Sequence, residues 1–302
     1  MTQMISRIKK YSRCFFFLLI VFALTKNFTG QPLKEARASE ESFSFVAIPD
    51  SESSGGKFNS ELNDIIKQAS KKDSDFAVFT GDIIMTTGGK LNDYYDSIKT
   101  VKNKMDSNFN KSYIVFGKHD IQCGYQCINL WFKIFWNRAL RPQEKAVLYH
   151  SFDYKNTHVV LLSTDYPKKH SIDNEQLSWL DNDLASTNKP NKIVFSHVPP
   201  ITFFKESAEE CHDMSCDESQ QAKLINIFKK HKVDLVISGH EHNFAYKVAN
   251  DIPYIISGNA GNGERYGLPQ KDIFTYVKID GEKIDIEAIE KNGDTVREIE
   301  VK

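Results

Sequence analysis

Residues 233–242 read V-D-L-V-I-S-G-H-E-H, an apolar run that ends in a glycine followed by two histidines. The apolar run is typical of a strand that is buried on both faces. His240 and His242 stand two positions apart, so in an extended segment both rings point the same way. Such a pair suits a metal ion such as zinc, iron or manganese. Two solvent-exposed loop histidines would give the same pattern, so this stretch alone leaves the choice open.

The composition is that of an ordinary globular protein. The chain has 302 residues, is 40% hydrophobic and carries a formal net charge of −1. This length suits one large domain or two small ones, with ample apolar material for a core. Seven of the 39 Lys and Arg residues lie within 1–38, which leaves the rest of the chain acidic. Nothing there indicates a nucleic-acid partner, which would favour a concentrated basic patch.

The N-terminus is typical of an export signal. Basic residues up to Arg13 precede eleven consecutive apolar positions at 14–24. This run is short for a bilayer span but fits the hydrophobic region of a signal peptide. The A-x-A site at 36–38 lies far from the run, so a membrane tether through 14–24 is an alternative. We therefore expect residues 1–38 to be a signal peptide or N-terminal membrane anchor with a linker. Residues 39–302 would form an extracytoplasmic domain, secreted or membrane-tethered.

Four cysteines follow the apolar run, at positions 123, 127, 211 and 216. An even number of cysteines in an exported chain favours disulfides. The short spacings predict two local disulfides, Cys123 with Cys127 and Cys211 with Cys216, although three pairings are open. A four-cysteine zinc site is less consistent with export.

Short apolar strands alternate with helices over much of the chain. Strands are expected at 43–48, 76–79, 113–116, 147–154, 157–164 and 192–195, and helices from 59 or 60 to 69, at 91–101, 173–186 and 219–230. Asp173 and Gln176 form a predicted capping box. The tail from Phe244 is expected to form antiparallel strands. The alternation predicts an α/β fold with βαβ units, whose ligands bind at the carboxyl ends of the strands.

Carboxylates and imidazoles follow five of the predicted strands: Asp50, Asp82, His119, His197, and the pair His240 and His242. Because the carboxyl ends of neighbouring parallel strands meet at one edge, we expect these side chains to converge. Such groups are the equipment of a hydrolytic site with one or two metal ions. The alternative is six unrelated surface residues. The other histidines, at positions 150, 158, 170, 212 and 231, are interpreted as surface or packing residues.

In order and spacing these motifs resemble the calcineurin-like metallophosphoesterases, and especially the purple-acid-phosphatase-like branch. The motifs are D-S-E at 50–52, G-D at 81–82, G-K-H-D at 117–120, S-H at 196–197 and G-H-E-H at 239–242. The stretches 151–165, 176–184 and 192–200 resemble that branch too. The resemblance implies that residues 39–302 form a four-layer α/β/β/α sandwich. It also implies hydrolysis of a phosphate mono- or diester, either a small molecule or a phospho-substrate.

The resemblance further implies a role for each motif residue. Two metal ions, divalent or trivalent (Mn, Zn, Fe or Ca), would share one carboxylate: Asp50, Asp82 and His242 for the first, and Asp82, His197 and His240 for the second. His119 would protonate the leaving group, and Asp120 would orient His119.

Two positions depart from the family pattern. Glu52 stands where the family usually has a histidine ligand of the first ion, but a carboxylate can still bind such a metal. Lys118 replaces the asparagine that binds the second ion, and an ammonium repels a cation. In one account, Lys118 stands in for that ion and binds a phosphoryl oxygen as a point charge. In the other, the protein is a non-catalytic extracytoplasmic protein that keeps the scaffold with a degenerate metal site.

Overall fold

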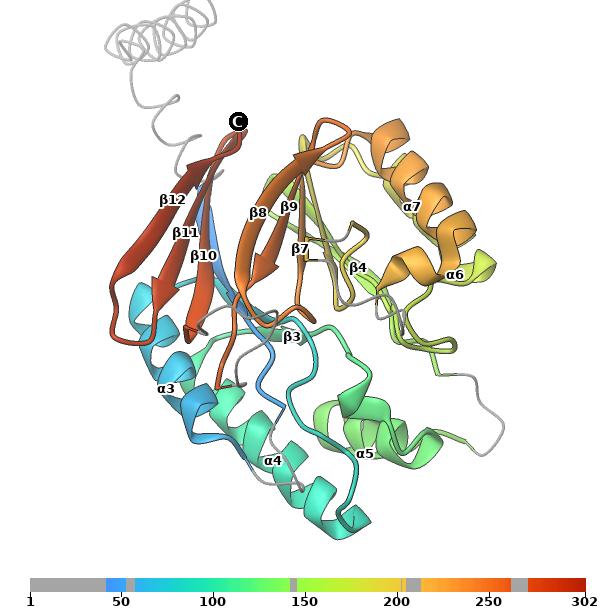
Figure 1. Ribbon diagram of the computed structural model, residues 1–302, viewed down its shortest axis with the longest axis vertical. Coiled ribbons are helices and arrows are strands. Elements are labelled where there is room, and N and C mark those ends of the chain that lie inside the picture. The colour runs from blue at the N-terminus through green and yellow to red at the C-terminus, as the bar shows by residue number, and fades with distance from the viewer. Residues whose placement is uncertain (1–41, 53–57, 142–145, 202, 205–212, 262–270) are drawn as a thin grey trace, which may run out of the picture. The chain divides into compact units, whose positions relative to one another are not determined.

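Two six-stranded sheets pack face to face (Figure 1). The structure, a computed structural model, describes residues 42–52, 58–141, 146–201, 203–204, 213–261 and 271–302. From edge to edge, the first sheet contains β12 (Thr295–Glu300), β11 (Lys283–Glu290), β10 (Ile273–Asp280), β1 (Phe43–Ile48), β2 (Phe76–Phe79) and β3 (Ser112–Ile114). The second contains β4 (His150–Tyr154), β5 (Thr157–Leu161), β6 (Asn191–Ser196), β7 (Leu235–Ser238), β9 (Ile252–Ser257) and β8 (Phe244–Ala249).

The central strands run parallel in both sheets, which brings several carboxyl ends to one edge. β1, β2 and β3 are parallel neighbours in the first sheet. β5, β6, β7 and β9 are parallel neighbours in the second sheet. The antiparallel arrangement predicted for the tail holds for the β8–β9 pair and for β10, β11 and β12. It is incomplete for β9, because this strand also pairs in parallel with β7.

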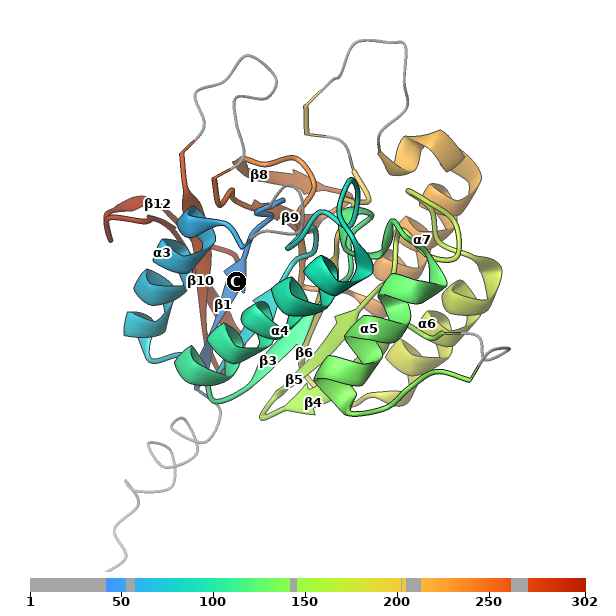
Figure 2. The same ribbon diagram turned by 90° about the horizontal axis from the view of Figure 1, so that it is seen from below.

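Helices cover the outer face of each sheet, so the predicted four-layer α/β/β/α sandwich is confirmed (Figures 1 and 2). The helices are α3 (Ser60–Ala69), α4 (Leu91–Asn108) and α5 (Tyr125–Trp136) on the first sheet, and α6 (Asn174–Ser186) and α7 (Glu218–His231) on the second. Between the sheets, Phe45 of β1 packs against Phe195 of β6, with ring centroids 5.6 Å apart. Burial of these apolar faces is the main stabilising contribution to the fold.

Two predicted helix starts are confirmed, at Asn59 and Asp173. At Asp173 only one of the two hydrogen bonds of the predicted capping box forms. The Asn59 side chain accepts a hydrogen bond from the Glu61 N–H at the start of α3. The Asp173 side chain accepts one from the Gln176 N–H at the start of α6. The reciprocal half of the capping box does not form, because the buried Gln176 amide bonds both backbone groups of Ser163. Gln176 thereby ties α6 to the end of β5.

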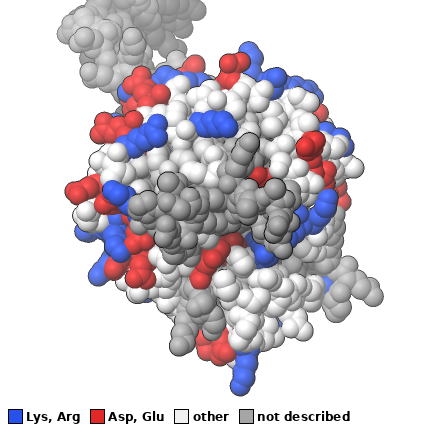
Figure 3. Space-filling view, viewed as in Figure 1, with Lys and Arg blue, Asp and Glu red and all other residues white. Residues whose placement is uncertain are grey.

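One predicted disulfide is confirmed, between Cys123 and Cys127 at the start of α5. Cys216 is also disulfide-bonded, and its predicted partner Cys211 lies outside the described residues. The predicted export segment at 1–38, with its apolar run at 14–24, lies outside them as well. No helix in the described part of the chain has the length and apolar character needed to cross a membrane. Acidic and basic side chains are interspersed over the face shown in Figure 3.

Candidate metal centre

The loops that follow β1, β2, β3 and β7 meet in one cavity. It has a volume of about 340 Å³ and is lined by Glu52, Asp82, Lys118, His119, His170, His240 and His242. Six of the nine predicted site residues therefore line this cavity. The other three, Asp50, Asp120 and His197, are fully buried behind its walls. The predicted convergence of strand ends thus occurs in the fold.

The backbone of these loops is held in unusual conformations. Five of the seven lining residues have a positive φ: Glu52 (34°), Asp82 (48°), His170 (52°), His240 (71°) and His242 (49°). Non-glycine residues rarely adopt this left-handed region, and such conformations cluster at functional sites. Glycine is required beside two of the carboxylates. A Cβ on Gly117 would lie 2.2 Å from Asp82 Oδ1, and one on Gly239 would lie 2.3 Å from Asp50 Oδ1.

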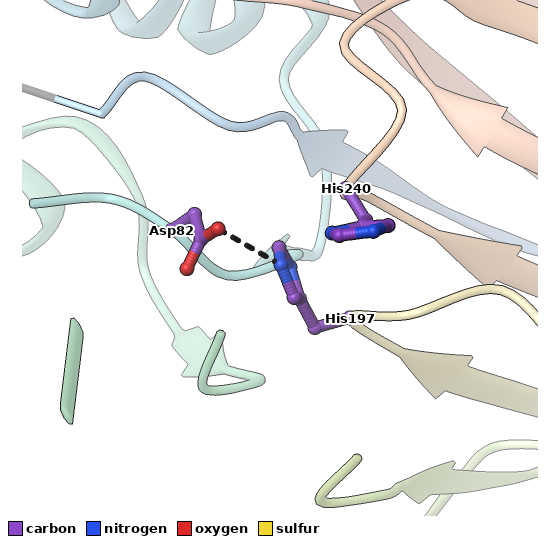
Figure 4. A group of neighbouring side chains, drawn as sticks. All are labelled: Asp82, His197 and His240. Atoms are coloured by element: carbon purple, nitrogen blue, oxygen red, sulfur yellow. Dashed lines mark ion pairs between the residues drawn. The ribbon is translucent and has the colours of Figure 1, made fainter. Parts of the chain in front are cut away.

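The second predicted ligand set comes together closely (Figure 4). Asp82 Oδ2 lies 3.0 Å from His197 Nε2. The ligand atoms of Asp82, His197 and His240 all lie within 4.8 Å of one another. His197 Nδ1 lies 2.9 Å from the Thr80 carbonyl oxygen, so Nδ1 carries the proton and Nε2 is the ligand atom. This donor set, one carboxylate oxygen and two imidazole nitrogens around a common point, fits a metal ion.

The electrostatics of the same group favour a cation. Burial alone would lower the pKa of His197, but the Asp82 and Asp50 carboxylates raise it well above its usual value. Burial alone would raise the pKa of Asp82, but His197 and His119 hold it well below its usual range. The pKa of His197 is raised because two carboxylates lie close to its ring, and the pKa of Asp82 is lowered because imidazoles lie close to its carboxylate. The same carboxylates would stabilise a metal ion bound between these groups.

The first predicted ligand set comes together less closely. His242 Nε2 lies 3.4 Å from Asp50 Oδ2 and 3.1 Å from Glu52 Oε1. Burial alone would lower the pKa of His242, but these two carboxylates raise it to about 9. Among the described residues, Asp50, Asp82 and His242 do not form a group whose ligand atoms all lie within 4.8 Å. Glu52 instead forms such a group with Asp82 and His119.

His119 lies in the cavity, and the structure does not bring the Asp120 carboxylate to its ring. His119 Nε2 faces Glu52 Oε1 at 3.4 Å, and Nδ1 lies 3.0 Å from Gln122 Oε1. The Asp120 carboxylate points elsewhere, because it accepts three backbone N–H groups, from Ile83 (2.9 Å), Ile84 (3.0 Å) and Gly117 (3.0 Å). Gln122 therefore takes the orienting position that the resemblance assigned to Asp120. Asp120 fixes the loops that carry the site.

Lys118 lines the same cavity as the predicted ligands. No residue in the described ranges forms an ion pair with its ammonium group. Its predicted role in catalysis requires a position from which it can reach a bound anion, and the wall of the cavity provides one.

His170, interpreted from the sequence as a surface or packing residue, is buried in the wall of the cavity. Its side chain is only 3% exposed and it lines the cavity. Its ring centroid lies 5.1 Å from that of His240. Asp165 directly follows the predicted strand at 157–164, and His170 lies five residues after Asp165. A carboxylate at the end of a sixth predicted strand was therefore the sequence feature that could have pointed to this loop. The packing interpretation holds for His158, which lies between Asp153 and Asp183.

Comparisons with known proteins identify similar sequences and similar folds. A model of the calcineurin-like phosphoesterase family matches residues 55–244. Over 158 residues the chain is 28% identical to a phosphoenolpyruvate phosphatase from Allium cepa. The matched region covers 49% of this chain and 30% of that protein. The chain therefore spans about a third of that curated relative.

Solved structures of two further proteins are similar in fold. The purple acid phosphatase PPD1 from yellow lupin (Lupinus luteus) has a TM-score of 0.67 and 14% identity, covering 86% of this chain and 53% of that one. GAP50, described as the anchor in the inner membrane complex of Plasmodium, has a TM-score of 0.59 and 17% identity, covering 86% and 89%. At these identities the likeness shows the fold alone. The family match, which spans more than half of the sequence, shows that this chain belongs to the calcineurin-like phosphoesterase family.

Proposed function

We propose that the chain hydrolyses a phosphate mono- or diester with one bound metal ion and with Lys118 as a fixed positive charge. The observation that carries the proposal is the close group of Asp82, His197 and His240, in or directly behind a cavity that also holds Lys118 and His119. Two imidazoles and a carboxylate suit zinc, iron or manganese, whereas calcium prefers oxygen ligands alone. When bound, the ion supplies Lewis-acid activation of the phosphoryl group and of water.

The Lys118 ammonium beside the proposed centre supports one ion and not two. Among the predicted metal ligands, the carboxylates of Asp50, Glu52 and Asp82 contribute three negative charges. Burial and the Asp82 carboxylate raise the pKa of Asp120 to about 8, so this carboxyl group is counted as neutral. One divalent ion and the Lys118 ammonium contribute three positive charges, so the centre is balanced. A second divalent ion would leave an excess of positive charge beside Lys118, and repulsion at such distances is strong in a buried site.

The residues of the chain then have separate tasks. Lys118 binds a phosphoryl oxygen, because a lysine ammonium on its flexible stem serves as a point charge for phosphate. His119 donates a proton from Nε2 to the leaving-group oxygen. Gln122 holds the opposite ring nitrogen and thereby fixes the direction of that proton. Glu52 Oε1, 3.4 Å from His119 Nε2, holds the ring in place until the substrate binds.

An assay with aryl phosphate mono- and diesters and added zinc, iron, manganese or magnesium tests the proposal. We expect metal-dependent turnover, and we expect His240→Ala to lower it by at least about 100-fold because a metal ligand is lost. His231→Ala is the matched control, since His231 bonds Asp181 and does not line the cavity. A folded wild-type protein without turnover for any metal or ester would overturn the proposal. It would favour the alternative, a non-catalytic extracytoplasmic scaffold.

The number of ions has its own test. Lys118→Asn removes the fixed positive charge beside the ion at Asp82, His197 and His240, so a second cation can bind at Asp50, Glu52 and His242. We expect elemental analysis to show a rise in metal content from about one ion per chain toward about two. An unchanged metal content would mean that Lys118 does not limit the number of ions.

We also propose that the protein is exported. The pattern of residues 1–38 supports this, and so does the Cys123–Cys127 disulfide, because disulfides persist in oxidising compartments. Fractionation of cells that produce the full chain, with N-terminal sequencing of the product, tests the proposal and separates cleavage from membrane anchoring. Recovery of the uncleaved chain in the cytosol would contradict it.

A further inference from the structure

We propose that His170 is a further metal ligand, which completes the set of Asp82, His197 and His240. This inference rests on the metal centre proposed above. It adds a ligand from the loop between β5 and α6, outside the motifs that define the family resemblance. A donor is needed there because Lys118, which replaces the expected asparagine, cannot bind a cation.

The spacing of the rings supports this assignment. With a metal–nitrogen bond of about 2.1 Å, the centre of a bound imidazole lies about 3.2 Å from the ion. Two imidazoles bound at a tetrahedral angle therefore have centres about 5.2 Å apart. The His197 and His240 centroids are 5.3 Å apart, and the His170 and His240 centroids are 5.1 Å apart. His170 is thus spaced from His240 as the predicted ligand His197 is.

The backbone at His170 resembles that of the predicted ligands. Its φ of 52° is close to those of Asp82 and His242, and all three residues line the cavity. A histidine that only fills space gains nothing from a strained conformation of this kind, which costs on the order of 1–3 kcal/mol. The fold holds His170 there at a cost, as it holds the ligands.

The surroundings of His170 fix its position. Asp165, whose side chain is 1% exposed, accepts the His170 backbone N–H at 3.4 Å, and the same oxygen lies 3.7 Å from His170 Nε2. At 3.7 Å this oxygen lies beyond hydrogen-bond distance of Nε2, so Asp165 anchors the backbone of His170 and lies beside its ring.

The loop that carries His170 is also joined to the strand end that carries His197. The Val198 N–H donates to Thr164 Oγ1 at 3.0 Å, and the Ser171 N–H donates to the Thr164 carbonyl at 2.8 Å. His170 lies outside the group whose ligand atoms are within 4.8 Å of one another, so its ring must turn toward the ion on binding. The anchored loop limits this movement to the side chain.

Zinc binding by the full chain tests the inference, with His170→Asn as the variant. Asparagine tolerates the left-handed backbone at this position, so the variant keeps the fold, which circular dichroism of the metal-free protein checks. We expect X-ray absorption spectra of the zinc-loaded protein to show three imidazoles in the wild type and two in His170→Asn. Competition with a chelating dye should show zinc affinity at least about 10-fold lower in the variant.

The controls separate this inference from the proposed function. His231→Asn should leave both the imidazole count and the zinc affinity unchanged. Two imidazoles in wild type and variant alike, with equal affinity, would overturn the role of His170 and leave the proposed centre intact. If the wild type bound no zinc, or if His240→Ala bound it as tightly, the proposed function would fail as well.

Discussion

Replacement of Asp120 by alanine is the sharpest test of how the site loops are held. The fully buried carboxylate accepts the N–H groups of Ile83, Ile84 and Gly117, at 2.9, 3.0 and 3.0 Å. Each buried N–H that loses its acceptor costs about 1–3 kcal/mol. Allowing for water that enters the vacated space, we expect Asp120→Ala to lower the free energy of unfolding by about 3–6 kcal/mol.

Urea unfolding of the metal-free protein, followed by circular dichroism, measures this loss without a contribution from metal binding. Asp234→Ala is the matched control, because Asp234 accepts one backbone N–H, from Lys192 at 2.8 Å, and pairs with Lys302. Its expected cost is about 1–2 kcal/mol. If Asp120→Ala were no more costly than the control and instead shifted the pH dependence of turnover, Asp120 would orient His119 after all, and our interpretation of the loops would be refuted.

Two further outcomes follow from close contacts. In Gly239→Ala the new Cβ would lie 2.3 Å from Asp50 Oδ1, so Asp50 must move. Asp50 accepts the His240 backbone N–H at 2.8 Å, so His240 moves with it, and we expect at least about 10-fold weaker zinc binding in a dye titration. Unchanged binding would contradict this prediction. Burial lowers the pKa of His158, but hydrogen bonds to Asp183 and Asp153 raise it above its usual value. The resulting stabilisation is fully present below the unfolded pKa of about 6.5 and is lost as the pH rises through the raised folded pKa. His158→Gln should therefore cost more stability at about pH 6 than at about pH 9 in urea unfolding, and equal costs would count against the ion pairs.

Much of the fold could be predicted because the information is local. The apolar run before His240 forms β7, and the acids and histidines that follow strands converge because parallel carboxyl ends meet at one edge. The start of α6 at Asp173 was also predictable, since a cap depends on residues within one turn.

Contacts between distant segments could not be predicted. Gln176 fitted a capping box by spacing, but burial directs its amide to Ser163, across the β5–α6 loop. Asp120 follows His119 directly, yet its carboxylate bonds backbone groups that lie 36 and 37 positions earlier, at Ile84 and Ile83. Both side chains act on the backbone of another segment, which no periodicity reveals.

The two departures from the family motifs compensate in charge but not in coordination. Glu52 in place of a histidine adds one negative charge, and Lys118 in place of an asparagine adds one positive charge, so the net charge of the motif residues is unchanged. Glu52 still offers a donor atom, whereas Lys118 removes one from the set of Asp82, His197 and His240. A centre that binds an ion at Asp82, His197 and His240 therefore needs a further donor atom from a residue outside the motifs. The buried imidazole of His170 lies beside that of His240, on a loop hydrogen-bonded to the end of β6, and can supply this donor. A centre that has lost one motif ligand can therefore still bind a metal ion.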